Sequence, residues 1–543
     1  MKKYISFFVL LAVALTSSAT ERSATKMRQA ALKTLSGAKV KSVLSKPTLE
    51  VYSDGTRFSI VSRDDRFPEV LAYGFGDFDI EQAPDNVKWW FERIQRSMEV
   101  TAYDDVPRHA NRSYIPIKPM VETKWGQDTP YNNYCPTIGK TNAPTGCIAT
   151  AMAQIMNYHQ YPASANFVGR YKVNNRPYTE SVNSTYLYPY KIAYGYYIPE
   201  NSSSVIRLQY TVSEGNSIAE LMRDCGYAVE MMYESDGSGA YSYMAGCALV
   251  EKFGYPQESV KYLMRDYFTD DEWMDMLYKE LSIGCPVLYG GSSEKSGGHA
   301  FVFHGMDAEG RACVNWGWQG QFDGYYSIDV LNPGGEDFSE DEDMIIGIRP
   351  EARPDDAMSC FIADIPYTFS YNNILKKLTL NFPNGIFNAG IRTFTGRWYL
   401  VVEDVNNPNN TTYIDIPNTG GFIEFLSGYT GSFSHDFIAT SSYRIYVATK
   451  DTDEADWQKV RTIGGAFYYE MTVSDKGIVT IADSPTFVTS SADNTAVRDI
   501  LYQPESTSSD VRYYDMQGRE LSNPTKGFVI RRQGGETKKI FIK

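Results

Sequence analysis

The sequence is poor in cysteine for its length. Its 543 residues include seven cysteines, and none forms a CxxC pair or a Cys/His cluster with the spacing of zinc ligands. So few cysteines argue against a disulfide framework in a long chain, and their odd number leaves at least one thiol unpaired if the protein is exported. For most of the seven we expect buried thiols that act as small hydrophobic side chains.

Positive charge and long apolar segments are also scarce. With 52 Lys and Arg against 66 Asp and Glu, the formal net charge of −14 argues against a protein that binds nucleic acid. No segment after the N-terminus is long and apolar enough to cross a bilayer, so we expect no stable membrane insertion.

Residues 1–19 have the pattern of a signal peptide, with Lys2 and Lys3 before a short apolar run and small residues after it, and a short membrane anchor is the alternative. We therefore expect a secreted or cell-surface protein.

The length predicts three or four domains at roughly 150 residues each, and the predicted fold class is α+β. In region 113–350, helices precede strands, which suggests two packed subdomains with a cleft between them where a substrate could bind. The predicted units after the signal peptide are a compact α+β unit (20–112), this α+β region (113–350), a β-sandwich (351–485), a linker rich in Ser, Thr and Asp (486–510) and a small all-β module (511–543).

Local patterns predict particular elements. Asp54-Gly55 indicates a hairpin, and apolar residues between Val87 and Met98 recur at helical spacing. The polar segment 104–113 is predicted to be an exposed linker, where proteolytic cleavage concentrates. In the centre we expect a helix beginning near Cys147, helices at 217–224, 241–253 and 270–281, and strands at 286–289, 299–303, 312–316 and 324–329.

Two segments carry candidate catalytic groups. Pro144-Thr-Gly-Cys147 comes directly before a predicted helix, where the helix dipole and open backbone N–H groups favour a thiolate. Taken alone, a Gly-Cys step at a helix start is more often a buried structural thiol than a nucleophile. The second segment, Ser296-Gly-Gly-His299, places an imidazole at the Gly-rich start of a strand, where it could take the thiol proton and return it to a leaving amine. Strand alternation aims the nearby His304 at the opposite face, so we assign it a structural role.

Two further segments could support such a pair. In Cys313-Val-Asn315-Trp316, the Asn315 amide could accept a hydrogen bond from the second ring N–H of His299, and the Trp316 indole could shield that bond from water. In Trp125-Gly-Gln127, the Gln127 amide could join the Cys147 backbone N–H in an oxyanion hole. Without the other motifs, Trp316 is as readily a core residue of a β-hairpin. Gln127 on its own is more readily an ordinary surface residue.

Taken together, these segments resemble the streptopain family of papain-like bacterial cysteine peptidases, which includes interpain. The matching stretches are Gly126-Gln127 with Pro130-Tyr-Asn132, Pro144 to His159, Gly297 to Val302 and Val314-Asn-Trp-Gly-Trp318. The resemblance implies a papain-like, two-subdomain catalytic domain and endopeptidase activity without a metal or organic cofactor. It also implies Cys147 as nucleophile, His299 as base, Gln127 in the oxyanion hole, and Asn315 with Trp316 supporting the histidine. The 152 residues from Cys147 to His299 are close to the separation in papain-like peptidases, about 130–150 residues. Gln319 departs from the family, which often has Gly there.

The flanking units extend the resemblance. Residues 20–112 resemble the family's propeptide, including the stretch 58–73 and the Trp89-Trp90 helix, which implies a latent precursor that is inhibited by its own propeptide and activated by cleavage near 105–114. The C-terminal stretches 514–519, 523–527 and 540–543 resemble sorting domains of Bacteroidetes-type exported proteins, so a secretion machinery is a possible partner.

The expected partners are otherwise protein or peptide substrates. Two other functions stay open at this point. A degenerate catalytic domain on a β-rich, aromatic-rich chain would suit a surface adhesion protein. A transpeptidase would use the same acyl-enzyme but pass the acyl group to an amine.

Overall fold

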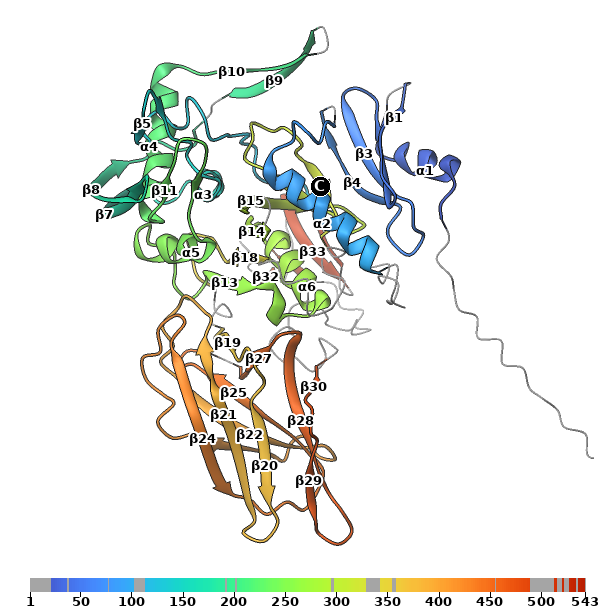
Figure 1. Cartoon of the computed structure of the whole chain (residues 1–543), viewed down its shortest axis with the longest axis vertical. Coiled ribbons are helices and arrows are strands. Elements are labelled where there is room, and N and C mark those ends of the chain that lie inside the picture. Colours follow the sequence, from blue (N-terminus) through green and yellow to red (C-terminus); the bar gives the residue numbers. More distant parts are fainter. Residues whose placement is uncertain are drawn as a thin grey trace, which may run out of the picture.

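The computed structural model describes residues 21–36, 39–76, 78–101, 113–190, 193–200, 203–293, 297–328, 342–353, 358–454 and 456–488, and four strands between 512 and 542. The predicted signal peptide lies outside these residues, as does residue range 102–112, which includes most of the predicted cleavage region at 105–114. We call residues 21–101 the N-terminal unit, 113–353 the central region, 358–488 the β domain and 512–542 the C-terminal module. Figure 1 shows the β domain below the central region and the N-terminal unit beside it.

One sheet of ten strands joins the N-terminal unit to the central region. Its order is β1-β2-β3-β4-β17-β16-β15-β14-β18-β13, and the junction is the antiparallel pair of β4 and β17, with Ala72 opposite Tyr326. The predicted hairpin at Asp54-Gly55 lies between β2 and β3. The strands are β1 Lys41–Ser45, β2 Leu49–Ser53, β3 Arg57–Ser62, β4 Val70–Phe75, β13 Lys261–Met264, β14 Val287–Ser293, β15 Gly297–Met306, β16 Ala312–Asn315, β17 Gly324–Tyr326 and β18 Asp343–Ile346.

The middle strands of this sheet separate two hydrophobic cores. Because side chains alternate along a strand, Phe301 and Phe303 of β15 enter one core while Ala300 and Val302 enter the other. Helices α2 (Asp85–Thr101) and α6 (Asp270–Ser282) cover the first core. Helices α3 (Cys147–His159), α4 (Val212–Ala228) and α5 (Ser242–Glu251) belong to the second. The predicted mixed α+β class is confirmed.

Smaller elements complete the central region and the N-terminal unit. Helix α1 (Ala24–Ala31) packs on β2 and β3, and the short 3-10 helix η1 (Arg265–Tyr267) links β13 to α6. A hairpin of two long strands, β7 and β8, was not predicted. The remaining strands are β5 Thr137–Ile138, β6 Thr141–Asn142, β7 Ser164–Val173, β8 Arg176–Thr185, β9 Ala193–Glu200, β10 Ser203–Gln209, β11 Met232–Tyr233 and β12 Ser238–Gly239.

The β domain has an apolar interior between two layers of strands, which pair antiparallel except for β19 with β27. Trp398 of β22 is fully buried, and its ring lies 5.0 Å from Phe361 and 5.5 Å from Tyr429, which belong to strands not paired with β22. The last strand still packs on β28, so the described domain reaches Val488. Its strands are β19 Phe361–Ile362, β20 Thr368–Asn372, β21 Lys377–Asn388, β22 Arg397–Asp404, β23 Thr411–Asp415, β24 Gly428–Asp436, β25 Tyr443–Lys450, β26 Gln458–Lys459, β27 Arg461–Thr462, β28 Gly465–Val473, β29 Val479–Ile481 and β30 Thr486–Phe487.

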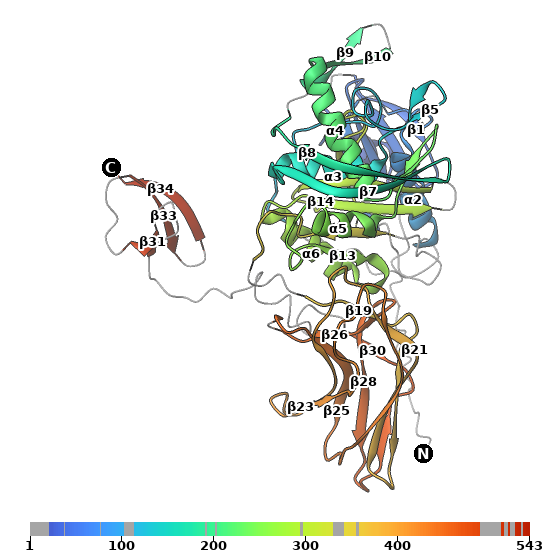
Figure 2. The same cartoon turned by 90° about the vertical axis from the view of Figure 1, so that its left-hand side faces the viewer.

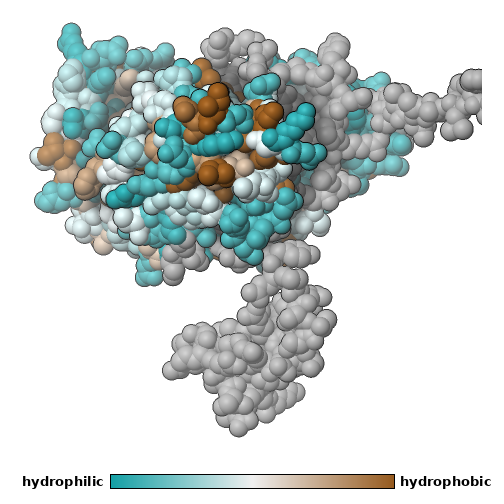
Figure 3. Space-filling model, turned by 90° about the horizontal axis from the view of Figure 1, so that it is seen from below, coloured by the Kyte–Doolittle hydropathy of each residue, from teal (hydrophilic) through white to brown (hydrophobic). Residues whose placement is uncertain are grey.

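The far end of the β domain carries exposed apolar side chains on its turns, namely Ile374, Leu375, Ile438 and Ile478. Figure 3, a view onto this end, shows hydrophobic patches among hydrophilic residues. The C-terminal module consists of β31 (Arg512–Tyr514), β32 (Glu520–Leu521), β33 (Gly527–Gln533) and β34 (Glu536–Ile542), which Figure 2 shows set apart from the other units. Over the described ranges, no helix combines the length and apolar character needed to cross a membrane.

Candidate active site

Cys147 is the first residue of α3, as its sequence context predicts. Gly146 precedes it with φ of 86°, a left-handed conformation that glycine adopts without strain. A Cβ atom at this position would also lie 3.0 Å from the backbone oxygen of Ser238 and 2.6 Å from Met231 Cε, so the local packing adds to the backbone preference for glycine. The turn therefore delivers Cys147 to the N-terminus of α3, where backbone N–H groups and the positive end of the helix dipole face the sulfur.

Opposing effects act on the Cys147 thiol. Burial is the largest and raises its pKa, while the backbone N–H groups of Ala300, Ile148 and Cys147 itself act to lower the pKa. The net pKa is raised, so the protonated thiol is favoured in this arrangement. Because Ala300 follows His299 on β15, its N–H brings the sulfur next to the strand that carries the imidazole.

Cys147 and His299 line the same cavity. Its volume is about 520 Å³, and its walls come from the start of α3, the ends of β14 and β15, the loop before α5, and β13 with η1. This volume suits a substrate side chain and part of a peptide backbone. The structure thus brings together the two groups that the sequence analysis assigned as nucleophile and base.

Asn315 lies on β16, opposite Val302 of β15, and its side-chain amide is fully engaged. Its Nδ2 donates to Thr123 O at 2.6 Å and to Gln154 Oε1 at 3.0 Å. Its Oδ1 accepts from Gln154 Nε2 at 3.1 Å and from the Gly317 N–H at 3.0 Å. Both donors and both lone pairs are therefore used, and a bond from His299 to this oxygen would have to replace one of them.

Trp316 is buried beneath the N-terminal unit rather than exposed over the cavity. Its ring lies 4.6 Å from Phe301 and 5.0 Å from Tyr326. Its backbone N–H donates to Asp323 Oδ1 at 3.0 Å, and its backbone carbonyl accepts from Asn86 Nδ2 of α2 at 2.8 Å. The N-terminal unit therefore contacts the segment that carries both Asn315 and Trp316.

Gln127 is buried in the loop beside the N-terminus of α3. Its backbone carbonyl accepts from the Thr145 N–H at 3.1 Å, which ties the loop to the turn that carries Cys147. Gln127, Asn315 and Trp316 lie behind the cavity wall rather than on it in this structure. Of the five predicted site residues, the cavity itself therefore joins Cys147 and His299.

His304 has the environment of a structural residue, in line with its predicted role. Its Nδ1 accepts from the Val121 N–H at 3.2 Å, and its Nε2 lies 3.6 Å from the Cys313 sulfur. Burial, with a smaller effect of Lys124, lowers the pKa of His304 to about 4. A buried imidazole that stays neutral at physiological pH is suited to packing rather than to proton exchange with solvent.

Helix α2 of the N-terminal unit contacts strand residues that line the cavity. Trp89 Nε1 donates to Ser292 O at 3.2 Å, and a Cβ at Gly291 would lie 2.3 Å from the Trp89 ring, so this position must be glycine. Arg93 Nε lies 3.6 Å from Glu342 Oε1, and both side chains are almost completely buried. Gly291, Ser292 and Glu342 all line the cavity with Cys147.

The sequence analysis missed several residues of the site. Gln154 lies in the stretch from Pro144 to His159, but the sequence analysis assigned it no role. In the structure its side-chain amide both donates to and accepts from the Asn315 amide. The tyrosines of the cavity wall and the acidic Glu342 come from segments with no recognisable motif. All seven cysteines lie in described segments and are free thiols. In the part of the chain that the structure covers, no group of three or more His, Cys, Asp or Glu side chains could hold a metal ion.

A thiol at a helix N-terminus that shares a cavity with an imidazole defines a site of the thiol-hydrolase class. The Peptidase C10 family model matches residues 125–326. Streptopain of Streptococcus pyogenes is 34% identical over 338 residues, which cover 56% of this chain and 82% of streptopain. The chain therefore belongs to the Peptidase C10 family, a family of cysteine peptidases, and the resemblance found in its sequence is confirmed.

Other relatives match shorter shares. The thiol protease/hemagglutinin PrtT of Porphyromonas gingivalis is 33% identical over 319 residues, 54% of this chain, and the match spans only 36% of PrtT. Among solved structures, a prointerpain A fragment of Prevotella intermedia is 31% identical and aligns over 58% of this chain and 99% of its own, with a TM-score of 0.49. Active interpain A is 35% identical over 45% of this chain and 100% of its own, with a TM-score of 0.37.

Proposed function

We propose that this chain is a secreted cysteine endopeptidase made as a zymogen, in which Cys147 attacks the peptide carbonyl and His299 is the general base. The observation that carries the proposal is the shared cavity of Cys147 and His299, with the Ala300 N–H directed at the sulfur. The two cores on either side of the central sheet would be the two subdomains of a papain-like catalytic domain.

The reaction follows from the groups at the cavity. His299 takes the Cys147 proton, the sulfur bonds to the carbonyl carbon, and the oxygen becomes an oxyanion that the Cys147 N–H and the Gln127 amide can stabilise. The C–N bond breaks as the imidazolium returns the proton to the amine, which leaves an acyl-enzyme. Water then attacks this thioester, giving one proton to His299, and the thiolate leaves and regains that proton. The products are a carboxylic acid, an amine and the original thiol.

Latency is proposed from the contacts of the N-terminal unit. Strand β4 completes the central sheet beside β17, and α2 contacts the segments of Ser292, Trp316 and Glu342. Two of these residues line the cavity, and the third follows Asn315. While α2 is docked, Asn315 Oδ1 accepts from Gln154 Nε2 and from the Gly317 N–H. Removal of the N-terminal unit would free the segment that carries Trp316 and Gly317 to move, so that His299 could replace the Gly317 N–H at the Asn315 oxygen.

The proposal extends to export. A signal peptide at residues 1–19 and a sorting-like C-terminal module would take the precursor across the envelope to the cell surface or medium. Processing near residues 105–114 would then release the active enzyme. Cleavage near residues 105–114 is supported by the described chain on either side, which is anchored by α2 on one side and by the Ile117–Met306 pairing on the other.

The deciding experiment compares the wild-type chain with Cys147→Ala and His299→Ala after secretion. We expect the wild type to cleave casein and to be labelled by an epoxide thiol inhibitor, and both variants to lose cleavage by at least about 10³-fold. Cys360→Ala, at a buried thiol far along the chain, is the matched control and should keep both activities. Full casein cleavage by Cys147→Ala would refute the assignment, and labelling without cleavage would favour the adhesion protein.

A further inference from the structure

We infer that the β domain forms part of the substrate groove, and that Phe425 with Tyr243 and Tyr262 makes a subsite for an aromatic side chain of a protein substrate. The inference rests on the proposed peptidase function. It concerns where the substrate chain lies beyond the bond that is cut. It also assigns a role to Phe425, which lies outside the range that the family model matches, residues 125–326.

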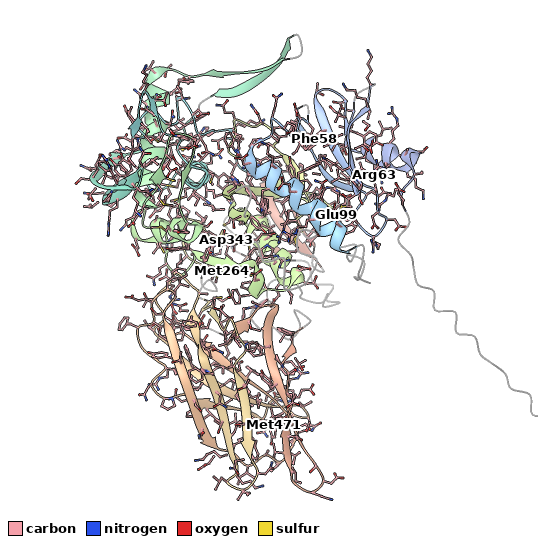
Figure 4. The ribbon with its side chains drawn as sticks, viewed as in Figure 1. Phe58, Arg63, Glu99, Met264, Asp343 and Met471 are labelled. Atoms are coloured by element: carbon pink, nitrogen blue, oxygen red, sulfur yellow. The ribbon has the colours of Figure 1, made fainter. Side chains whose placement is uncertain are left out.

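The cavity that holds Cys147 and His299 extends well away from them. At its far side it is lined by residues of β13, η1, the loop before α5 and the first turn of α5, among them Tyr241, Tyr243, Tyr262, Met264, Asp266 and Tyr267. Met264 is the register partner of Asp343 on β18, and both side chains line this wall. Figure 4 shows Met264 and Asp343 at the edge of the central region that faces the β domain. The groove therefore ends at the junction of the two domains.

Phe425 of the β domain stands at this junction. Its ring centroid lies 5.1 Å from Tyr243 and 6.1 Å from Tyr262, with interplanar angles of 39° and 87°. Tyr243 also stacks on Tyr241, at 5.8 Å and 18°. Phe425 is only partly buried, and the next residue, Leu426, keeps 56% of its surface exposed. An aromatic surface thus continues from the cavity wall onto the β domain.

The loop that presents Phe425 is held in a fixed conformation. Ile423 and Phe394 exchange backbone hydrogen bonds of 2.9 and 3.0 Å, and the Leu426 N–H donates to Asn388 O at 2.7 Å. Leu426 has φ of 57°, a left-handed conformation that side chains branched like leucine rarely adopt. Strained residues of this kind persist where the surroundings over-determine them, and they concentrate at ligand-binding sites. A fixed loop offers a pre-organised surface, which reduces the entropy lost on binding.

The β domain also fixes the other end of the same wall. Tyr267 Oη donates to Asp364 Oδ1 at 2.5 Å, and the Gly464 N–H donates to the Asp266 backbone carbonyl at 2.8 Å. Behind them, Arg461 forms a two-point ion pair with Glu272 at 2.9 and 3.1 Å. Four residues of the groove wall, Tyr243, Tyr262, Asp266 and Tyr267, are thus in contact with the β domain. The β domain therefore supports this wall of the groove from outside, and the residues that line the cavity itself belong to the central region.

An extended substrate chain is the occupant that this arrangement fits. The cavity is continuous from the sulfur to the aromatic surface, so a peptide held at Cys147 can run toward Phe425. Three rings that meet at tilted and edge-to-face angles can accept a fourth ring in an offset or edge contact. A contact of this type changes binding by about three- to tenfold.

The test uses the full chain after removal of the N-terminal unit and a set of quenched fluorescent peptides. All peptides share one cleavable core, and a single Trp replaces Gly at successive positions outside it. For the wild type we expect kcat/KM to rise about three- to tenfold when Trp occupies one particular position, through a lower KM. Phe425→Ala should lose this preference, and Phe425→Trp should keep it. Phe425→Leu preserves most of the packing volume but should lose most of the Trp preference. It therefore shows that a loss seen in Phe425→Ala does not come from a folding defect.

Ile438→Ala is the control, because Ile438 is 72% exposed on the same domain and lies outside the groove. It should retain the wild-type preference. The all-Gly peptide reports on the catalytic centre of each variant. Equal Trp preference in wild type and both Phe425→Ala and Phe425→Leu, or no preference at any position in the wild type, would overturn the subsite. If the wild type cleaves no peptide at all, the proposed peptidase function itself fails.

Discussion

Arg93 of the N-terminal helix α2 lies 3.6 Å from Glu342, a residue that lines the cavity shared by Cys147 and His299. Both side chains are at most 3% exposed. Tyr289 Oη also donates to Glu342, at 2.6 Å. Burial raises the pKa of Glu342, and the charges of Arg93 and Arg265 and the Tyr289 bond oppose this effect without cancelling it. The N-terminal unit therefore places a positive charge against a buried carboxyl group of the groove.

Loss of this charge should weaken the docking of the N-terminal unit. We expect Arg93→Met to leave the Glu342 carboxyl without its charged partner on α2, while the Tyr289 hydrogen bond and the charge of Arg265 remain. Because breaking a buried pair outright costs about 3–5 kcal/mol, the loss here should be smaller than this. The thermal midpoint of the full-length precursor should fall, and Cys147 should react faster with a thiol label. Lys88→Met is the control on the same helix, because Lys88 forms an exposed pair with Asp85 and should change stability by less than about 1 kcal/mol. An Arg93→Met precursor with unchanged melting and labelling would contradict the expected role.

The Cys147 thiol should be a poor nucleophile in the intact precursor. Because burial raises its pKa, the thiolate fraction at neutral pH is smaller than that of a free cysteine, whose pKa is about 8.5. The rate of alkylation by iodoacetamide, followed for the Cys147 peptide by mass spectrometry, should therefore rise with pH through a midpoint above about 8.5. Removal of the N-terminal unit should move this midpoint down.

Cys247 provides an internal reference for that measurement. It is the other partly exposed thiol, and burial followed by the charge of Glu251 raises its pKa to about 11. Its alkylation should keep the same pH dependence before and after removal of the N-terminal unit. A midpoint for Cys147 below pH 7 in the intact precursor would show that the thiolate is already stabilised there.

Local sequence patterns predicted the elements with strong periodicity or clear end signals. The apolar spacing from Val87 to Met98 corresponds to α2, and the Gly-Cys step at 146–147 marks the start of α3. Helix α4 was predicted too short, from residue 217, whereas it begins at Val212. Thr211 and Glu214 form a capping box there, a signal that the sequence contains and that would have placed this start.

Features that depend on distant contacts could not be predicted in this way. The β7–β8 hairpin turns at Asn174-Asn175, both in the left-handed conformation. Strand β7 alternates between buried and exposed residues, a signal that the sequence contains, but β8 is exposed over most of its length and lacks this pattern. The pairing of β4 with β17 joins residues about 250 positions apart, and no local sequence pattern predicts it. The candidate site shows the same difference between local motifs and distant contacts. Motifs identified Cys147 and His299, whereas the contact between Phe425 and Tyr243 depends on how two domains dock.

Gln154 should position Asn315 for its support of the imidazole. The Gln154 amide exchanges two hydrogen bonds with Asn315 and also accepts from Thr123 and the Trp125 N–H. Gln154→Leu removes these partners inside the protein, and each unsatisfied group costs about 1–3 kcal/mol. In the processed enzyme we expect lower kcat and a shifted pH profile of kcat/KM, with little change in KM.

The exposed Gln321→Leu is a suitable control for this change and should leave the pH profile unaltered. Gln154→Glu offers a second reading, because its carboxylate can still accept from Thr123 and Trp125 but cannot donate to Asn315. Compared with Gln154→Leu, the Gln154→Glu enzyme should regain more of the lost stability than of the lost kcat. A Gln154→Leu enzyme with lower stability but the wild-type pH profile would show that Gln154 acts only on folding.

The ion pair of Arg461 with Glu272 should make the docking of the β domain depend on pH. Burial acts to raise the pKa of Glu272, but the charge and hydrogen bonds of Arg461 and the bonds from Thr269 outweigh it, and the pKa is lowered. A carboxyl group whose pKa is lower in the folded state stabilises that state above its unfolded pKa, about 4.3, and loses this contribution as the pH falls through the folded value. The thermal midpoint should therefore drop in this acidic range.

Arg461→Met should remove that acidic dependence and lower the midpoint at pH 7, because a buried carboxylate loses its partner at a cost of about 3–5 kcal/mol. The matched control is Arg397→Met, which breaks the exposed Arg397–Asp415 pair of the same domain and should change stability by less than about 1 kcal/mol. Because Arg461 supports the groove wall through Tyr267, whose backbone carbonyl it contacts at 3.0 Å, Arg461→Met should also weaken the Trp preference at the Phe425 subsite. If the midpoint falls while the Trp preference is unchanged, the ion pair stabilises the domain junction without shaping the groove.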